Sequence, residues 1–192
     1  MRIATRSSAL ALAQAGAVAD AIGGAELVHV RNVAGDVGDK ARFTRTVEEA
    51  LRDGRAELGV HSAKDLPGEM PDDLALVGVP LREDPADAFI GLAAALGEVP
   101  VGARIGTASL RRRSQLLALR PDLEVVEIRG NVDTRLRKLA EGELDGIVLA
   151  VAGLKRLGRE DEIARTDPFK PSRFGVVSSS RDPKTDGNRS RA

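Results

Sequence analysis

The sequence contains no cysteine, tryptophan or tyrosine, and only two histidines and four phenylalanines. Without cysteine the chain cannot form a disulfide, a thiolate nucleophile or a thiolate metal site. Two histidines are too few for a typical histidine-rich metal centre, so we expect no metal site. Because aromatic side chains are scarce, the base stacking used by single-strand nucleic-acid binders is not expected either.

Charge and hydropathy exclude two further classes of partner. The chain has 29 basic and 29 acidic residues, so its formal net charge is zero and gives no reason to expect nucleic acid or an anionic membrane. No apolar run approaches the roughly 20 residues that span a bilayer. The N-terminus lacks the apolar stretch of a signal peptide. We therefore expect a cytoplasmic monomer that binds neither nucleic acid nor membrane.

Short apolar runs alternate along the chain with patterns of helical period. This alternation predicts an α/β fold with mostly parallel sheets. Strands are expected at Arg2–Thr5, Glu26–Val33, Glu57–His61, Leu74–Val79, Arg104–Thr107, Leu123–Ile128 and Gly146–Val151. Helices are expected to run from the cap Ser8 to Ala21, and over Thr44–Arg52, Ser109–Leu119, Asn131–Ala140 and Gly153–Leu157.

The pattern is interrupted at two places. The charged segment Leu81–Asp87 contains Pro85 and is the candidate hinge between two lobes, residues 1–82 and 83–163, with a cleft between them. Residues 164–192 contain few apolar side chains and are rich in serine and proline. Such a segment buries too little apolar surface to offset its ordering entropy, so we expect an irregular or disordered tail.

The segment His61–Pro67 follows a predicted strand, where ligand sites of open α/β sheets lie. It places the hydroxyl of Ser62, the ammonium of Lys64 and the carboxylate of Asp65 within four residues. The carboxylate could accept an N–H group and stabilise a developing cation. The alternative is an ordinary turn, since Lys64, Asp65 and Pro67 are all favoured in turns. His61 itself is expected to be a buried, hydrogen-bonded residue and not a catalyst.

A set of arginines follows predicted strands or begins predicted helices, where free N–H groups and the helix dipole favour anions. Guanidinium groups bind carboxylates through two hydrogen bonds at a time. Thr107, Ser109 and the Gly130–Asn131 turn add further donors. The set predicts a ligand with several carboxylates or phosphates, although a solvated charged helix face is the alternative for any single member. Its members are Arg6, Arg111, Arg112, Arg113, Arg129, Arg135 and Arg156.

The polar loop Gly35–Phe43 contains two glycines and could form a mobile lid that brings Lys40 and Phe43 to a ligand. The alternative is a surface loop that Phe43 anchors to the core. No Walker loop, dinucleotide-binding glycine motif or zinc motif is present, and no catalytic triad is indicated.

Several blocks together resemble the porphobilinogen deaminase (hydroxymethylbilane synthase) family, specifically the first two of its three domains. They occur in the order found in that family and span residues 1–163. The blocks are Arg2–Ala15, His61–Pro67, Arg82–Phe89, Gly106–Arg112, Arg129–Leu136 and Leu149–Gly158.

The resemblance implies two periplasmic-binding-protein-like lobes with the active site in the cleft between them. It implies an enzyme of tetrapyrrole biosynthesis that condenses four porphobilinogens into hydroxymethylbilane and releases ammonia. Asp65 would be the catalytic carboxylate that holds pyrrole nitrogens and stabilises the cation left when ammonia departs. Residues matching cofactor-binding positions are Ser62, Lys64, Thr107, Ser109, Arg111, Arg112, Arg129 and Gly130. Residues matching positions that bind substrate and the growing polypyrrole are Arg6, Ser8, Gln14, Phe43, Arg135 and Arg156.

The chain departs from the family in three ways. The family attaches a dipyrromethane cofactor to a cysteine in its third domain, whereas this chain has no cysteine. We find no family block after about Ile163, and the loop 35–43 is shorter than its family counterpart. We therefore expect impaired activity. The alternatives are a non-catalytic module that binds a polycarboxylate or tetrapyrrole, and an inactive fragment.

Overall fold

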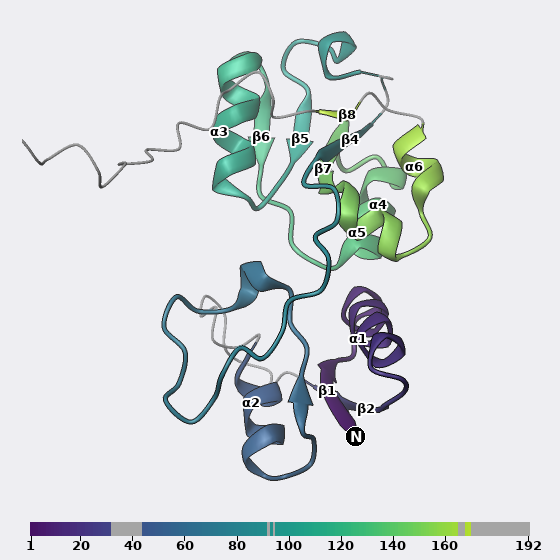
Figure 1. The fold of residues 1–192 in the computed structure, drawn as a ribbon. Coiled ribbons are helices and arrows are strands. Elements are labelled where there is room, and N and C mark those ends of the chain that lie inside the picture. The colour runs from purple at the N-terminus through teal and green to yellow at the C-terminus, as the bar shows by residue number, and fades with distance from the viewer. Residues whose placement is uncertain (32–43, 92, 94, 165–167, 170–192) are drawn as a thin grey trace, which may run out of the picture.

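The computed structural model describes residues 1–31, 44–91, 93, 95–164 and 168–169. They form two β-sheets, each covered by helices and stacked one above the other (Figure 1). The predicted lid, with Lys40 and Phe43, lies outside the described residues, as does most of the tail expected to be irregular.

The first sheet is parallel and has the order β2-β1-β3. Its strands are β1 (Arg2–Arg6), β2 (Glu26–Val30) and β3 (Leu58–Gly59). Because successive side chains of a strand point to opposite faces, Ile3 and Ala4 enter different cores. Ile3 packs with α1 (Ala9–Ala21), and Ala4 packs with α2 (Arg45–Arg52).

The second sheet has five strands in the order β6-β5-β7-β4-β8. They are β4 (Asp87–Gly91), β5 (Arg104–Gly106), β6 (Glu124–Val126), β7 (Gly146–Ala150) and β8 (Pro168–Phe169). Strand β5 is parallel to β6 and β7, whereas β4 is antiparallel to β7 and β8. The predicted α/β class with mostly parallel sheets is confirmed.

Helices cover both faces of the second sheet. On one face Leu116 of α3 (Leu110–Leu119) packs against Phe89 and Val148. On the other, α4 (Val132–Ala140) and α5 (Val151–Arg156) pack against Ile147 and Leu149. Helix α6 (Glu160–Ala164) follows, and two short 3₁₀ turns, η2 (Ala63–Asp65) and η3 (Leu96–Glu98), complete the elements. In the described part of the chain, every helix is too short or too polar to span a lipid bilayer.

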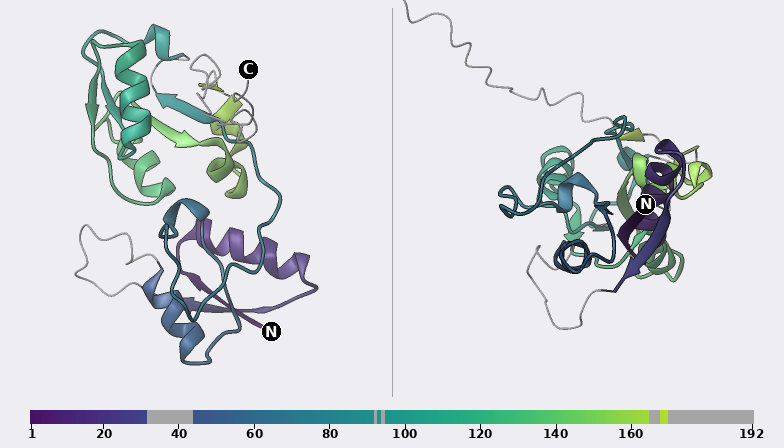
Figure 2. Two further views of the ribbon diagram at one scale, coloured as in Figure 1. Left: turned by 60° about the vertical axis from the view of Figure 1, so that its left-hand side comes forward. Right: turned by 60° about the horizontal axis from the view of Figure 1, so that its bottom comes forward.

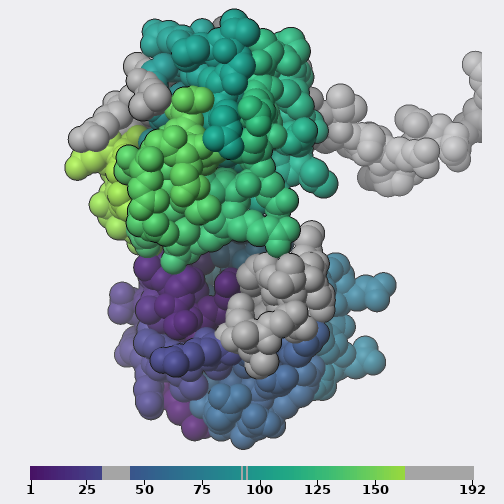
Figure 3. Space-filling view, turned by 180° about the vertical axis from the view of Figure 1, so that it is seen from behind, coloured from purple at the N-terminus to yellow at the C-terminus, as the bar shows by residue number. Residues whose placement is uncertain are grey.

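The two halves meet where α1 contacts α5 (Figures 1 and 2). Within the described residues the chain passes from the first half to the second through residues 81–86, and Lys155 of α5 holds this crossing by an ion pair of 3.0 Å with Glu83. Seen from behind, one half sits directly on the other (Figure 3). The carboxyl ends of β3, β5 and β6 point toward the opposite half (Figure 1), so residues that follow these strands lie near the junction.

Three sequence predictions differ from the structure. Leu74–Val79 is not a strand, because no described strand lies beside it, and its side chains Leu76, Val77 and Val79 are exposed. Asp87, assigned to the hinge, begins the unpredicted strand β4. Pro168–Phe169, assigned to the irregular tail, pair with β4 as β8.

Candidate functional site

The first group of site residues lies at the carboxyl edge of the first sheet. Asp65 is the last residue of η2, which follows β3, and its Oδ2 lies 3.9 Å from the Nη1 of Arg6 at the end of β1. The hydroxyl of Ser62 donates to the Oε1 of Gln14 over 2.8 Å. The structure therefore brings four predicted residues together around this turn, and Lys64 is exposed beside them.

Next to Asp65, the half-buried imidazole of His61 has a lowered pKa. Burial is the largest cause, because it disfavours the charged form of the ring, and the positive charge of Arg6 adds to it. The carboxylates of Glu48 and Asp65 oppose this shift. The sequence predicted a buried His61, whereas the ring is only partly buried, and its neutral form is favoured.

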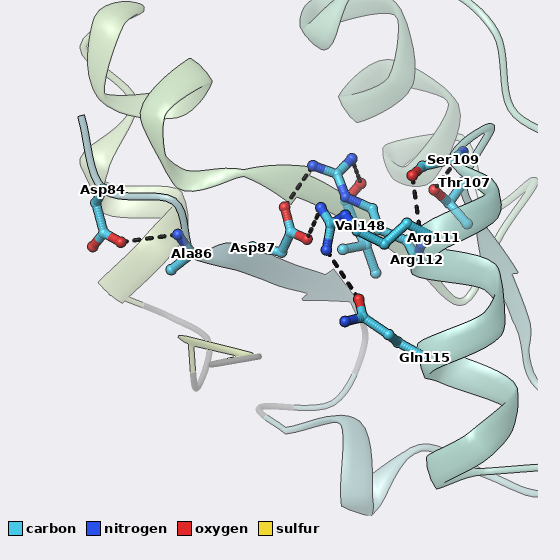
Figure 4. Close-up of polar contacts among 9 residues, drawn as sticks. All are labelled: Asp84, Ala86, Asp87, Thr107, Ser109, Arg111, Arg112, Gln115 and Val148. Carbon is cyan, nitrogen blue, oxygen red and sulfur yellow. Dashed lines mark hydrogen bonds and ion pairs between the residues drawn. The ribbon is translucent and has the colours of Figure 1, made fainter. Parts of the chain in front are cut away.

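The second group lies at the carboxyl edge of the second sheet and centres on Asp87 (Figure 4). The Nη2 of Arg111 lies 2.8 Å from the Oδ2 of Asp87, and the Nη2 of Arg112 lies 2.6 Å from its Oδ1. The Nη1 of Arg112 also donates to the carbonyl of Val148 over 3.1 Å. Asp87 is buried with 2% of its side chain exposed, so its two arginines compensate a charge removed from water.

Asp87 belongs to this candidate site and was not singled out from the sequence. The first residue of β4 reaches the carboxyl edge of its neighbours because β4 runs antiparallel to β7, with Asp87 opposite Ala150 at the end of that strand. Its signal in the sequence was an acid immediately before the apolar run Ala88–Ile90. A buried strand that begins with a carboxylate requires a cation nearby.

Three predicted hydroxyl groups cap backbone N–H groups. Ser8 and Ser109 accept from the N–H groups of Ala11 and Arg112 as N-caps of α1 and α3, over 3.3 and 3.4 Å. Thr107 accepts from the N–H of Ser109 over 3.2 Å. Because a hydroxyl can accept and donate together, each keeps a proton that it can give to an anionic ligand.

The guanidinium groups of Arg112 and Arg135 are incompletely compensated by the protein. Within the described part of the chain, the buried Nε of Arg112 has no hydrogen-bond partner. Burial lowers the pKa of Arg135, and the charge of Arg112 lowers it further. The Nε of Arg135 donates to the carbonyl of Gly130, which precedes α4, over 2.9 Å. A carboxylate bound here would accept a hydrogen bond from the Nε of Arg112. Its negative charge would also offset the repulsion between Arg112 and Arg135.

Other predicted residues have partners outside these two groups. Arg129 is exposed and pairs with Glu127 over 2.8 Å, which fits the solvated-face alternative. Arg156 is exposed at the end of α5, where its charge helps to lower the pKa of Glu83. Arg113, the third of the consecutive arginines, donates to the carbonyl of Val125 over 2.6 Å.

Two surface pockets of about 440 and 250 Å³ lie in the second half. Their lining residues include residues of α4 but none of the predicted site residues. Among the described residues, no group of three or more histidine or carboxylate side chains could hold a metal ion.

Residues 1–177 match a family model described as porphobilinogen deaminase, dipyromethane cofactor binding domain. The chain belongs to the porphobilinogen deaminase family. The matched range runs to residue 177, so the expectation that the family pattern ends at about Ile163 is wrong.

Relatives named porphobilinogen deaminase occur in several bacteria. One from Nitratidesulfovibrio vulgaris (strain DSM 19637 / Miyazaki F) is 53% identical over 172 residues, which cover 81% of this chain and 54% of the relative. One from Roseiflexus sp. (strain RS-1) is 51% identical over 177 residues, covering 84% of this chain and 58% of the relative. The chain thus spans little more than half the length of these relatives.

Among solved structures, the methionine binding protein MetQ aligns with 82% of this chain and 73% of its own, with 17% identity and a TM-score of 0.48. The periplasmic sulfonate-binding protein SsuA from Methylobacillus flagellatus KT aligns with 82% of this chain and 53% of its own, with 15% identity and a TM-score of 0.34.

Proposed function

We propose that this chain is the part of a porphobilinogen deaminase that binds oligopyrroles through their carboxylate side arms. The observation that supports this most directly is the arginine group of the second sheet. Arg111 and Arg112 share one acid, Asp87, and the charge of Arg112 also acts on Arg135, so three positive charges gather near a single carboxylate partner. A ligand that supplies carboxylates would compensate the charge that remains, whereas a neutral ligand would leave it unpaired.

The residues at this edge fit a dipyrromethane cofactor, because its acetate and propionate groups match the buried donor of Arg112. We assign its binding to Thr107, Ser109, Arg111, Arg112, Arg129 and Gly130, with Ser62 and Lys64 from the first sheet. The chain has no cysteine, so these residues could hold the cofactor only through ion pairs and hydrogen bonds. When bound, this group supplies the pyrrole end to which substrate units are joined.

Asp65 is the proposed catalytic residue. A carboxylate at the end of η2 can accept a hydrogen bond from a pyrrole N–H and stabilise positive charge that develops as ammonia leaves. Arg6, 3.9 Å away, would hold it in place and bind a substrate carboxylate. Ser8, Gln14, Phe43, Arg135 and Arg156 complete the proposed substrate contacts.

We also propose that residues 1–82 and 83–163 are separate domains, with 164–192 as an irregular tail, and that the chain acts as a cytoplasmic monomer. The separate cores support the domain division, since residues 3–60 supply two of them and residues 86–154 supply the other two. Light scattering of the purified chain would test its oligomeric state.

Calorimetry with porphobilinogen tests the binding proposal. We expect the wild-type chain to bind it, and Arg135→Gln to weaken the affinity at least tenfold, about 1.4 kcal/mol. Arg137→Gln is the matched control, because Arg137 lies on the same helix but pairs with Glu141 in solvent. Equal affinities for both variants would contradict the assignment of the site.

Ammonia release distinguishes the enzyme from its alternative, a module that binds without chemistry. The alternative is supported by the absence of a cysteine for covalent attachment. If the chain is an enzyme, Asp65→Asn should remove turnover and leave the affinity within a fewfold of wild type. Binding without ammonia release by the wild-type chain would favour the binding module.

A further inference from the structure

Asp87 bridges two arginines that differ sharply in exposure. The side chain of Arg111 is 53% exposed, whereas that of Arg112 is 13% exposed. Arg112 is anchored on the protein side, because its two terminal nitrogens donate to Asp87 and to the carbonyl of Val148. Among the described residues, the partners of Arg111 are the side chains of Asp87 and Gln115.

One carboxylate thus links two adjacent guanidinium groups (Figure 4). The oxygens of Asp87 each take one arginine, so the carboxylate stands between the two groups and prevents either from turning away. Two consecutive helical residues point in directions about 100° apart, and would not present parallel donors without such a bridge. A planar guanidinium binds a carboxylate well only when its donors are correctly aimed.

We propose that Asp87 is a positioning residue of the anion site, which holds Arg111 and Arg112 in the orientation that an incoming carboxylate requires. The inference rests on the proposed function, since it concerns the same site. It runs against simple electrostatics, because a buried acid beside an anion site should by its charge alone weaken anion binding. Asp87 contributes to affinity only if its alignment of the arginines outweighs that repulsion.

The direction in which Asp87→Asn changes the affinity separates alignment of the arginines from charge repulsion. Asp87→Asn removes the negative charge and keeps the size of the side chain. If Asp87 positions the arginines, the variant should bind porphobilinogen at least tenfold more weakly than wild type, although its site is more positive. Asp87→Glu, which keeps the charge, should recover part of the affinity. Unchanged or stronger binding by Asp87→Asn overturns the proposal.

A matched control is available at the other end of α3. Asp122 accepts two hydrogen bonds, of 2.8 and 2.6 Å, from the single arginine Arg120, and its side chain is 28% exposed. Asp122→Asn should lower the melting temperature without changing the dissociation constant for porphobilinogen. If Asp122→Asn weakens binding as much as Asp87→Asn, the effect is a general loss of structure and the proposal fails.

A measurement on the unaltered chain keeps the test decisive if Asp87→Asn does not fold. Nuclear magnetic resonance of the arginine side chains reports rotation about the Nε–Cζ bond. Separate Nη signals for both Arg111 and Arg112 in the ligand-free protein are expected if Asp87 holds them. Averaged Nη signals for Arg111 overturn the positioning role whether or not porphobilinogen binds. Failure of the wild-type chain to bind porphobilinogen contradicts only the proposed function.

Discussion

The hydroxyl of Ser62 donates to the Oε1 of Gln14 over 2.8 Å, and this contact ties the turn that carries Asp65 to helix α1. The two residues are 48 positions apart in sequence, so the bond joins separate elements of the first half. We expect Ser62→Ala to lower the free energy of unfolding by about 1 kcal/mol, since the bond is partly shielded from water.

A double-mutant cycle with Gln14→Ala checks this prediction by urea unfolding. The coupling energy should be about 0.5 to 1.5 kcal/mol, because each single substitution already removes the shared bond. Ser114→Ala is the control, since the Ser114 hydroxyl donates within its own exposed helix to Leu110, and it should change stability by less than about 0.5 kcal/mol. A coupling of zero would show that the bond does not hold the turn in solution.

Much of the fold followed from the sequence because its signals are local. Ser8, Ser109 and Asn131 each accept a hydrogen bond from the first turn of a helix, and residues with this capping ability mark helix starts in sequence. Strand β7 was recognisable because it is buried on both faces and reads as a continuous apolar run.

The misassigned elements depend on distant neighbours. Leu74–Val79 has the composition of a strand, but a strand exists only where another chain segment pairs with it. The direction of β4 depends in the same way on its pairing with β7, and that direction alone brings Asp87 to the site. The arginines could therefore be identified from the sequence. The acid that pairs with Arg111 and Arg112 could be identified only once the pairing of the strands was known.

The lowered pKa of His61 predicts a loss of stability in mildly acidic solution. The folded protein binds a proton at His61 less readily than the unfolded chain, whose histidine has a pKa near 6.5. The free energy of unfolding should therefore fall as pH drops below about 6.5, where the unfolded state gains the proton first. Carboxylates with lowered pKa values, such as Glu57 and Asp122, lose their contribution only at lower pH.

Unfolding by urea between pH 7.5 and 5 measures this effect, because this range brackets the pKa of an unperturbed histidine, about 6.5. His61→Gln should flatten the decline, because the glutamine does not titrate. His29→Gln replaces the exposed histidine of β2 and should leave the decline in place. An identical pH profile for wild type and His61→Gln would contradict the prediction.

Gly146 leaves room for the ring of Phe89 in the second core. A Cβ added at Gly146 would lie 2.4 Å from the Cε2 of Phe89, which is buried and cannot move aside. Gly146→Ala should therefore destabilise the protein by about 1 to 3 kcal/mol. Gly97→Ala, where an added Cβ meets no atom within 4 Å, should be nearly neutral.

Phe89→Leu tests whether the ring is the cause. The double variant Gly146→Ala with Phe89→Leu should be more stable than the sum of the two single changes predicts, by about 0.5 kcal/mol or more. Additive losses in thermal or chemical unfolding would place the strain elsewhere, for example against Ile105, whose Cδ1 lies 3.1 Å from the added atom.

Leu81 and Leu154 are leucines in opposite environments, and their substitutions should differ accordingly. Leu154 of α5 is 0% exposed in the core of the second half, so Leu154→Ala should cost about 2 to 5 kcal/mol through lost contacts and a residual cavity. Leu81, in the crossing between the halves, is 98% exposed. Leu81→Lys should change the unfolding free energy by less than about 0.5 kcal/mol, because the leucine is already in water.

Light scattering of concentrated samples extends this comparison. Leu81 follows the exposed Val77 and Val79 in the sequence, and exposed apolar side chains favour association. Leu81→Lys should therefore lower the scattering of a concentrated sample while the melting temperature stays the same. If Leu81→Lys instead lowers the melting temperature as much as Leu154→Ala does, Leu81 must be buried in solution. An exposed leucine would not lose that much stability on substitution.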